Sequence, residues 1–322
     1  DGRSGMPRHE MSMLIVDGKI AQLATSGKIK ARPGWKVLRL PGRYVLPGLI
    51  DTHAHVTFLR DPDHFSGHDP AVSERVLKIL LAHGITTTRN PAAPEDEAVR
   101  LRARLNKGLT IGPQMLAAGR PIDFGPDRSA EDVRIEVRRQ AGTGIDYIKV
   151  YAKMPPALIR AAVDEAHAHK LKVIGHLQAS SPREAVDAGI DAITHAATWT
   201  TSLLPEDRRA PYESRRREVG SMRARMDWLE WMDGDSPEML GSIRAVVESR
   251  TPVDPTLIAY ATKFLGRDPR YRASPYLCMV PAEIRETWDG WLDDWPEDAF
   301  VQGRRSWPRL LELIYWPTLQ LL

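Results

Sequence analysis

The chain has 322 residues, 42% of them hydrophobic and 27% charged, which is a globular composition with enough apolar mass for a sizeable core. Its 45 basic and 42 acidic residues leave a net charge of +3, and the densest basic run, ESRRRE (213–218), is bounded by glutamates, so nucleic acid is not an expected partner. No apolar stretch approaches the roughly 18–20 residues of a membrane helix, and the single cysteine, Cys278, excludes an internal disulfide.

The N-terminus bears on where the protein resides. No signal peptide is visible, so we expect a cytoplasmic protein with no membrane partner. Because the chain starts at Asp1 and not at methionine, an exported protein whose leader precedes Asp1 is the alternative.

Residues 1–44 predict a small β-subdomain. MSMLIVDGKIAQL (11–23) and WKVLRL (35–40) are short β-type runs. The Asp17-Gly18 pair between apolar runs is a hairpin signal, because both residues tolerate the positive φ of a tight turn.

From residue 45 to residue 322 the pattern changes to strands that alternate with helices. The expected strands are 44–51, 84–90, 114–119, 145–151, 171–176, 190–195 and 251–260. The expected helices between them are 70–83, 94–107, 129–140, 155–170 and 181–189, and the last closes on Gly189. Repeated β-then-α units predict an α/β fold with a parallel sheet, and seven strands favour a (β/α)₈ TIM barrel.

Four histidines and one lysine follow the ends of these strands. His53 and His55 come after the first strand, Lys149 lies near the end of the fourth, and His176 and His195 close the fifth and sixth. The carboxyl ends of parallel barrel strands open onto one face, so we expect these side chains to converge. A lone histidine at a strand end is more often a satisfied polar residue, and a lone lysine could lie at the surface. The complete set, in phase with the β/α repeat, predicts a metal site instead.

The segments PGLIDTHAHV, GITTTRN, DYIKVY, VIGH and ITHA, in this order, resemble the amidohydrolase superfamily, and most closely its imidazolonepropionase-like and prolidase-like members. The resemblance implies a (β/α)₈ barrel with a small β-sandwich, of which residues 1–44 would be an incomplete part. It implies a divalent metal cofactor, two Zn²⁺ per chain, and hydrolysis of a C–N bond by metal-activated water. The implied ligands are His53, His55, His176, His195 and Lys149, which is carboxylated by CO₂ in relatives with two metals.

The resemblance stops after residue 260. Relatives carry an aspartate after strand 8, in a GTD-like motif, and no GTD or GSD follows TPVDPTLIAY (251–260) here. The acidic stretch WDGWLDDWPED (288–298) is typical of a solvated helix face and does not replace that aspartate. We therefore expect a chain truncated before strand 8, whose catalytic acid–base group is unknown. The loss of such a group typically costs about 10²–10⁴ in rate.

Two further residues are candidate substrate contacts. Tyr151 lies two residues after Lys149 and points the same way. Arg89 could bind a substrate carboxylate or form a structural ion pair. The expected partner is a small molecule, an amide or a dipeptide, and a homo-oligomer is an open alternative. The sequence thus predicts a metal-dependent amidohydrolase, with a truncated and catalytically impaired metal-binding remnant as the alternative.

Overall fold

The computed structural model describes residues 6–62, 64–195, 198–293 and 297–320. The chain divides into two compact units, Asp1–Leu49 and Ile50–Leu322. In the first unit, β1 (Met11–Val16) and β2 (Lys19–Thr25) form the expected antiparallel hairpin, with positive φ at Asp17 and Gly18 in the turn. The strand predicted over 35–40 is wrong: this segment is irregular and its large apolar side chains are exposed, because no neighbouring strand in the described part of the unit supplies hydrogen bonds to it.

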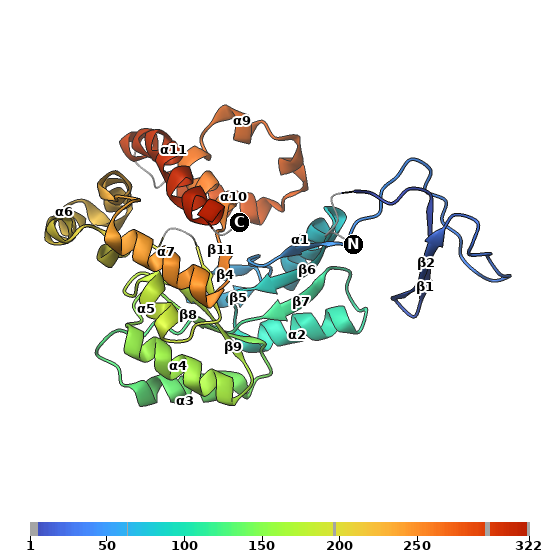
Figure 1. The fold of residues 1–322 in the computed structure, drawn as a ribbon, viewed down its shortest axis with the longest axis horizontal. Coiled ribbons are helices and arrows are strands. Elements are labelled where there is room, and N and C mark those ends of the chain that lie inside the picture. The colour runs from blue at the N-terminus through green and yellow to red at the C-terminus, as the bar shows by residue number, and fades with distance from the viewer. Residues whose placement is uncertain (1–5, 63, 196–197, 294–296, 321–322) are drawn as a thin grey trace. The chain divides into compact units, whose positions relative to one another are not determined.

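The second unit contains the parallel strands (Figure 1). One sheet has the order β11–β10–β9–β8, and the other has the order β3–β6–β7. All neighbours in the first sheet pair in parallel, as do β6 and β7. Single parallel bridges, Ala118–Tyr147 and Ile122–Val150, connect the two sheets. The strands are β3 (Leu49–Asp51), β6 (Ile85–Asn90), β7 (Gln114–Ala117), β8 (Tyr147–Val150), β9 (Lys172–His176), β10 (Ala192–Thr194) and β11 (Val253–Asp254).

Helices alternate with these strands as predicted. They are α1 (Pro70–Ala82), α2 (Glu95–Asn106), α3 (Ala130–Ala141), α4 (Pro156–Ala168) and α5 (Pro182–Asp187). Local chemistry sets their ends: Ser129 and Asp132 form a reciprocal capping box at the start of α3, and Gly189 adopts the left-handed conformation just beyond α5. An antiparallel pair, β4 (Leu59–Asp61) and β5 (Ser66–His68), precedes α1.

The later part of the chain is helical. It contains α6 (Glu206–Trp231), α7 (Pro237–Ser249), α8 (Leu257–Leu265), α9 (Pro269–Arg272), α10 (Ala282–Asp293) and α11 (Glu297–Gln320), with 3₁₀ turns at Thr201–Leu203 and Pro275–Met279. Gly220 has φ of 82°, which divides α6 into two helices. None of the helices, within the residues described, is long and apolar enough to cross a membrane.

The strand predicted over 251–260 is wrong in its length. Only Val253 and Asp254 pair with β10, and α8 begins at Leu257. Pro255 has no N–H to donate to a sheet, and Thr256 has a positive φ of 47° that turns the chain out of the strand. The carboxyl end of β11 therefore lies at Asp254.

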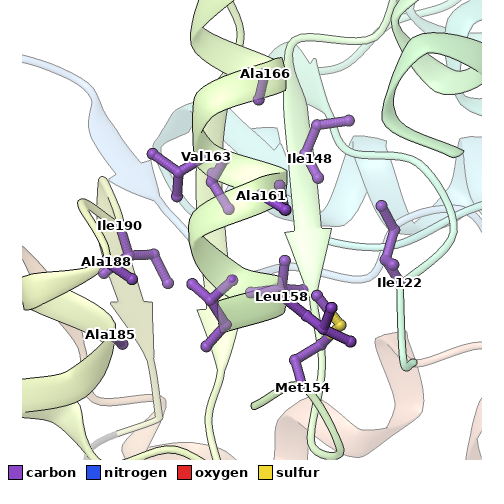
Figure 2. Packing of buried hydrophobic residues seen from close by; sticks show 14 of the residues in the cluster. Ile122, Ile148, Met154, Leu158, Ala161, Val163, Ala166, Ala185, Ala188 and Ile190 are labelled. Atoms are coloured by element: carbon purple, nitrogen blue, oxygen red, sulfur yellow. The ribbon is translucent and has the colours of Figure 1, made fainter. Parts of the chain in front are cut away.

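The main core lies between the sheet and the helices that cover it (Figure 2). Ile148 of β8 and Ile159 and Val163 of α4 are buried together, and Ile190, just before β10, packs in the same cluster. A second cluster, with Tyr212, Trp228 and Phe264 among its members, joins α6, α8 and α11. The first of these cores holds β8, β9 and β10 in register, so it fixes the positions of the residues at their carboxyl ends.

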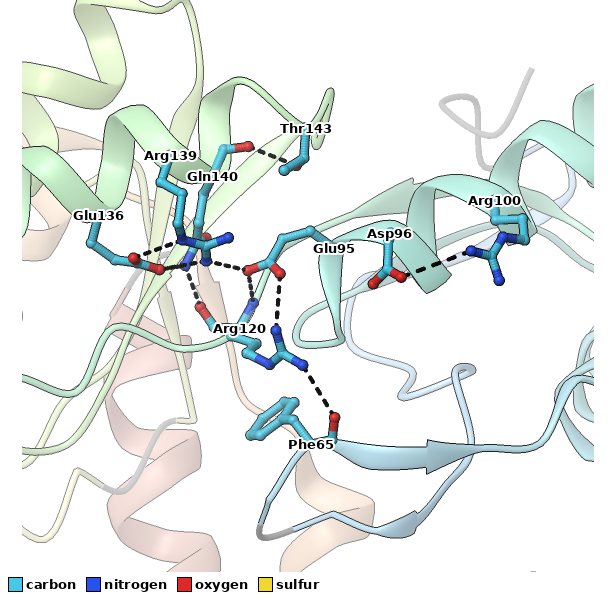
Figure 3. A network of polar contacts seen from close by, with 9 residues as sticks. All are labelled: Phe65, Glu95, Asp96, Arg100, Arg120, Glu136, Arg139, Gln140 and Thr143. Atoms are coloured by element: carbon cyan, nitrogen blue, oxygen red, sulfur yellow. Dashed lines mark hydrogen bonds and ion pairs between the residues drawn. The ribbon is translucent and has the colours of Figure 1, made fainter.

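A buried carboxylate connects the helical layer to the sheet (Figure 3). Glu95, at the start of α2, is 3% exposed. It accepts a hydrogen bond from the backbone N–H of Arg120 at 3.1 Å and pairs with the guanidinium groups of Arg120 and Arg139 at 3.4 and 2.9 Å. Gln140 donates to the Arg120 carbonyl at 2.9 Å. This network holds α2 and α3 to the loop that follows β7.

Candidate functional site

The two histidines after β3 lie on an irregular segment that hydrogen bonds of its backbone hold in place. Asp51 accepts a hydrogen bond from the backbone N–H of His53 at 2.9 Å, and Ala54 donates to the carbonyl of Arg89 in β6 at 3.1 Å. The chain therefore continues beside β6 after β3 has ended. This places His53 and His55 beyond the carboxyl end of the strand, as the sequence predicts for a site at this face.

The structure brings the four predicted histidines together. The ring of His53 lies 5.3 Å from that of His55 and 4.9 Å from that of His195, measured between centroids. The ring of His176 lies 4.5 Å from that of His195. Residues from three separate strand ends thus form one cluster of imidazoles. The cluster is contiguous because β9 and β10 are neighbours and pair in register, with Thr194 opposite His176.

The surroundings keep two of these imidazoles uncharged. Burial lowers the pKa of His53 to about 2, and the positive charge of Lys149 and the neighbouring imidazoles add to the effect. Desolvation and Lys149 lower the pKa of His55 to about 4, although its side chain retains solvent exposure. At neutral pH both rings therefore offer a nitrogen lone pair, the form in which histidine binds a metal.

Lys149 is buried beneath this cluster, at 2% exposure. Its Nζ donates a hydrogen bond to Thr194 Oγ1 at 2.6 Å, and the Thr194 hydroxyl in turn donates to the carbonyl of Gly175 at 2.8 Å. Burial lowers the pKa of Lys149 to about 7, helped by the charge of Arg89 and opposed by Asp254. The neutral amine is therefore well populated near neutral pH, which is not true of a surface lysine.

Sequence reasoning missed two residues that the structure adds to the site. Asp254 lies at the end of β11, and its side chain is 12% exposed. Its Oδ2 accepts a hydrogen bond from Thr52 Oγ1 at 2.8 Å and lies 3.6 Å from His53 Nδ1. Thr256 Oγ1 lies 2.6 Å from His195 Nδ1. Both residues fall inside the strand predicted over 251–260. The rule that functional groups follow strand ends would have found them if that end had been placed correctly.

The two predicted substrate contacts differ in their surroundings. Arg89 has its side chain 11% exposed, donates from Nε to the Thr52 carbonyl at 2.8 Å and has Nη2 3.5 Å from Asp254 Oδ2. Tyr151 is 36% exposed, and its ring lies 4.4 Å from that of His176. Partial burial raises the pKa of Tyr151. Arg89 is thus occupied by protein groups, whereas Tyr151 lies beside the histidines with part of its surface open.

The acidic stretch at 288–298 was expected to form a solvated helix face, and its described carboxylates lie on helix surfaces. Asp289 pairs with Arg272, and Asp298 pairs with Arg223 at 2.8 Å, each on a helix surface. The side chains of residues 293–296 lie outside the described part of the chain. Among the described residues, Asp254, which belongs to another segment, places a carboxylate oxygen 3.6 Å from His53 Nδ1.

The donor chemistry of the cluster suits a divalent metal. Uncharged imidazoles are among the ligand types of zinc sites. His53 Nδ1 is buried and has no hydrogen-bond partner among the described residues. In that same part of the chain, no three acidic, histidine or cysteine side chains form a ready-made coordination geometry. The uncharged histidines are thus of the kind that binds a divalent metal.

Comparison with known proteins assigns the chain to a family. The sequence model of the amidohydrolase family matches residues 44–205, about half of the chain. The chain therefore belongs to the amidohydrolase family, hydrolases that act on amide-like carbon–nitrogen bonds. An adenine deaminase of Paracoccus denitrificans (strain Pd 1222) is 24% identical over 127 residues, which cover 36% of this chain and only 20% of that protein.

Solved structures show the same fold at low sequence identity. A Xaa-Pro dipeptidase with methionine bound in its active site matches with a TM-score of 0.57 and 17% identity, over 94% of this chain and 79% of the dipeptidase. Phenylurea hydrolase B matches with a TM-score of 0.58 and 16% identity, over 95% of this chain and 84% of that enzyme. At this identity the likeness concerns the fold, a mixed α/β architecture with parallel strands.

Proposed function

We propose that this protein is a metal-dependent hydrolase that cleaves a C–N bond in an amide, a peptide or a cyclic amide through a metal-activated water. The observation that carries the proposal is the gathering of four histidines and the buried Lys149 at the carboxyl ends of β3, β8, β9 and β10. Family membership supports the same reaction class. We further propose that the parallel strands belong to a (β/α)₈ barrel, whose active sites lie at this face.

The proposed metal ligands are His53, His55, His176, His195 and Lys149, with two zinc ions per chain. The lowered pKa of Lys149 supports its carboxylation, because only the neutral amine attacks CO₂; the nitrogen loses a proton and the product is a negatively charged carbamate. Thr194 is placed to hold this side chain by its hydroxyl. When bound, the metal would acidify a water from a pKa of about 15.7 toward roughly 7 and polarise the scissile carbonyl.

We propose that the substrate is a small molecule with a carboxylate, such as a dipeptide. The proximity of its ring to that of His176, 4.4 Å away, supports Tyr151 as a substrate contact. Arg225 lies over the ring of Trp199 at 5.9 Å and its charge acts on the Tyr151 hydroxyl, although the charge of Asp123 acts on that hydroxyl more strongly and in the opposite direction. We assign Arg89 the structural pairing described above and not substrate binding.

Membrane and nucleic-acid partners are not part of the proposal; a cytoplasmic location and a homo-oligomer remain compatible with it.

Metal content of the purified chain, expressed with added zinc and bicarbonate, tests the proposal. We expect about two ions per chain by mass spectrometry and release of product from dipeptides. The variant Lys149→Met should lose metal, while Lys78→Met, the same substitution on the exposed face of α1, should not. Folded wild-type protein with a stoichiometry near zero would overturn the proposal. Full metal loading without turnover on amides and dipeptides would instead support a catalytically impaired metal-binding protein.

A further inference from the structure

The turn Asp254-Pro255-Thr256 connects β11 to α8 and faces two of the site histidines with its two polar side chains. Thr256 Oγ1 lies 2.6 Å from Nδ1 of His195, a hydrogen bond. Asp254 Oδ2 lies 3.6 Å from Nδ1 of His53. The two side chains of the turn thus approach the same ring atom, Nδ1, of two imidazoles that lie at the ends of different strands.

The Asp254 carboxylate is itself held from several sides. Thr52 Oγ1 donates to Oδ2 at 2.8 Å, and Arg89 Nη2 lies 3.5 Å from the same oxygen. The backbone N–H of Thr256 donates to Oδ1 at 3.3 Å, and the backbone N–H of His195 donates to the Asp254 carbonyl at 2.7 Å. Thr52 just after β3, Arg89 of β6 and His195 just after β10 therefore fix the turn. A carboxylate restrained in this way can orient a neighbouring imidazole.

The backbone at both ends of the Thr256–His195 contact is strained. His195 has φ of 72° and Thr256 has φ of 47°. A positive φ is costly for residues other than glycine, and more so for a β-branched residue such as threonine. Such conformations persist only when the surroundings impose them, and they gather at functional sites. Here two of them are joined by one side-chain hydrogen bond.

We propose that the Asp254-Pro255-Thr256 turn positions the metal-binding imidazoles of His53 and His195 by binding Nδ1 of each ring, so that Nε2 is the nitrogen left for the metal. A histidine that ligates a metal through one nitrogen usually donates its other N–H to a carboxylate or another oxygen, which sets the tautomer and the ring orientation. Thr256 Oγ1 already lies within hydrogen-bond distance of His195 Nδ1. Asp254 Oδ2 and His53 Nδ1 need to approach each other by about half an ångström to form the corresponding hydrogen bond.

This inference rests on the proposed function, because it concerns how the chain prepares ligands for a metal. A purely structural role is the competing explanation: Asp254 could serve only to attach β11 to β3 through Thr52. That role predicts a loss of stability when Asp254 is changed, but no specific effect on the tautomers of His53 and His195. The tautomers are therefore the deciding observable.

The experiment combines zinc affinity with ¹⁵N spectra of histidine-labelled, metal-free full-length protein. The variants are Thr256→Val and Asp254→Ala, with Thr256→Ser and Asp254→Asn as versions that keep an oxygen at each position. Thr251→Val is the matched control, because Thr251 bonds to Ser249 ahead of β11 and does not reach the site. Thermal unfolding of each variant shows which ones fold.

We expect the proton on Nδ1 of His53 and His195 in the wild type. Thr256→Val and Asp254→Ala should each shift the proton of one ring to Nε2 and weaken zinc binding by about 10–100-fold. Thr256→Ser, Asp254→Asn and Thr251→Val should stay close to the wild type. Protons on Nε2 in the wild type, or unchanged zinc affinity in folded Thr256→Val and Asp254→Ala, would overturn the inference. Absence of zinc binding by the wild type would overturn the proposed function, and the ¹⁵N spectra would still decide whether the turn sets the tautomers.

Discussion

Gly175 occupies the position in β9 directly before His176, and there is no room for a side chain there. A Cβ at this position would lie 2.5 Å from Ile190 Cδ1, 3.1 Å from Leu177 Cδ2 and 3.2 Å from Val150 Cγ2. Non-bonded carbon atoms prefer separations of about 3.5–4.0 Å, so the closest pair must move apart by about 1 Å. All three neighbours are buried, and the core therefore has little freedom to yield.

We expect Gly175→Ala to lower the free energy of unfolding by roughly 1–3 kcal/mol, the usual cost of overpacking a core. Alanine is otherwise favoured over glycine in a strand by about 0.5–1 kcal/mol, so a net loss would show that the clash outweighs the backbone preference. The displacement should also reach the site. The Gly175 carbonyl accepts a hydrogen bond from the hydroxyl of Thr194, and that hydroxyl in turn accepts one from Lys149. A shift of Gly175 would therefore move Lys149, and we expect weaker zinc binding as well.

A double-mutant cycle isolates the clash. Ile190→Val removes the Cδ1 atom that approaches to 2.5 Å, and by itself should cost about 0.5–1.5 kcal/mol. Urea unfolding followed by circular dichroism gives the four free energies. The double variant should be more stable than the sum of the single losses predicts, by at least about 1 kcal/mol. Wild-type stability of Gly175→Ala, or strict additivity of the two changes, would refute the reasoning.

Two further predictions concern buried or half-buried carboxylates. Glu95→Ala leaves the backbone N–H of Arg120 without its acceptor, and we expect a loss of about 1–3 kcal/mol in a thermal unfolding assay; an unchanged melting temperature would contradict the role of this network. Burial acts to raise the pKa of Asp191, but hydrogen bonds from Lys172 and other donors outweigh it and the pKa is lowered overall. A lowered carboxyl pKa stabilises the fold above the ordinary value near 4, and this contribution disappears as the pH falls through the folded-state pKa. Asp191→Asn should therefore lower the free energy of unfolding at pH 7 and change it little at strongly acidic pH. Urea unfolding at the two pH values measures both effects. Equal losses of stability at the two pH values would count against the ion pair.

Local chemistry along the chain was enough to predict the helices and parallel strands between residues 70 and 195. The capping box of Ser129 and Asp132, the terminal Gly189 and the alternation of apolar runs depend on residues a few positions apart, so the helices and strands between 70 and 195 are where the pattern predicts them. The histidines could be assigned to one face for the same reason. Each lies at the end of a strand or a few residues after it, and parallel strands bring their carboxyl ends together.

The groups that support the site depend on contacts between distant parts of the chain. The contact of Thr52 with Asp254 joins residues that are 202 positions apart, and no local pattern encodes it. The apolar run at 251–260 predicts a long strand, whereas Pro255 and the left-handed Thr256 end it at Asp254 and turn two polar side chains toward His53 and His195. The burial of Lys149, and with it the lowered pKa, likewise depends on packing from several strands at once. Which residues lie at the strand ends could be predicted from the order of residues along the chain, because that is a local property. Which groups hold those residues in place was decided by long-range packing.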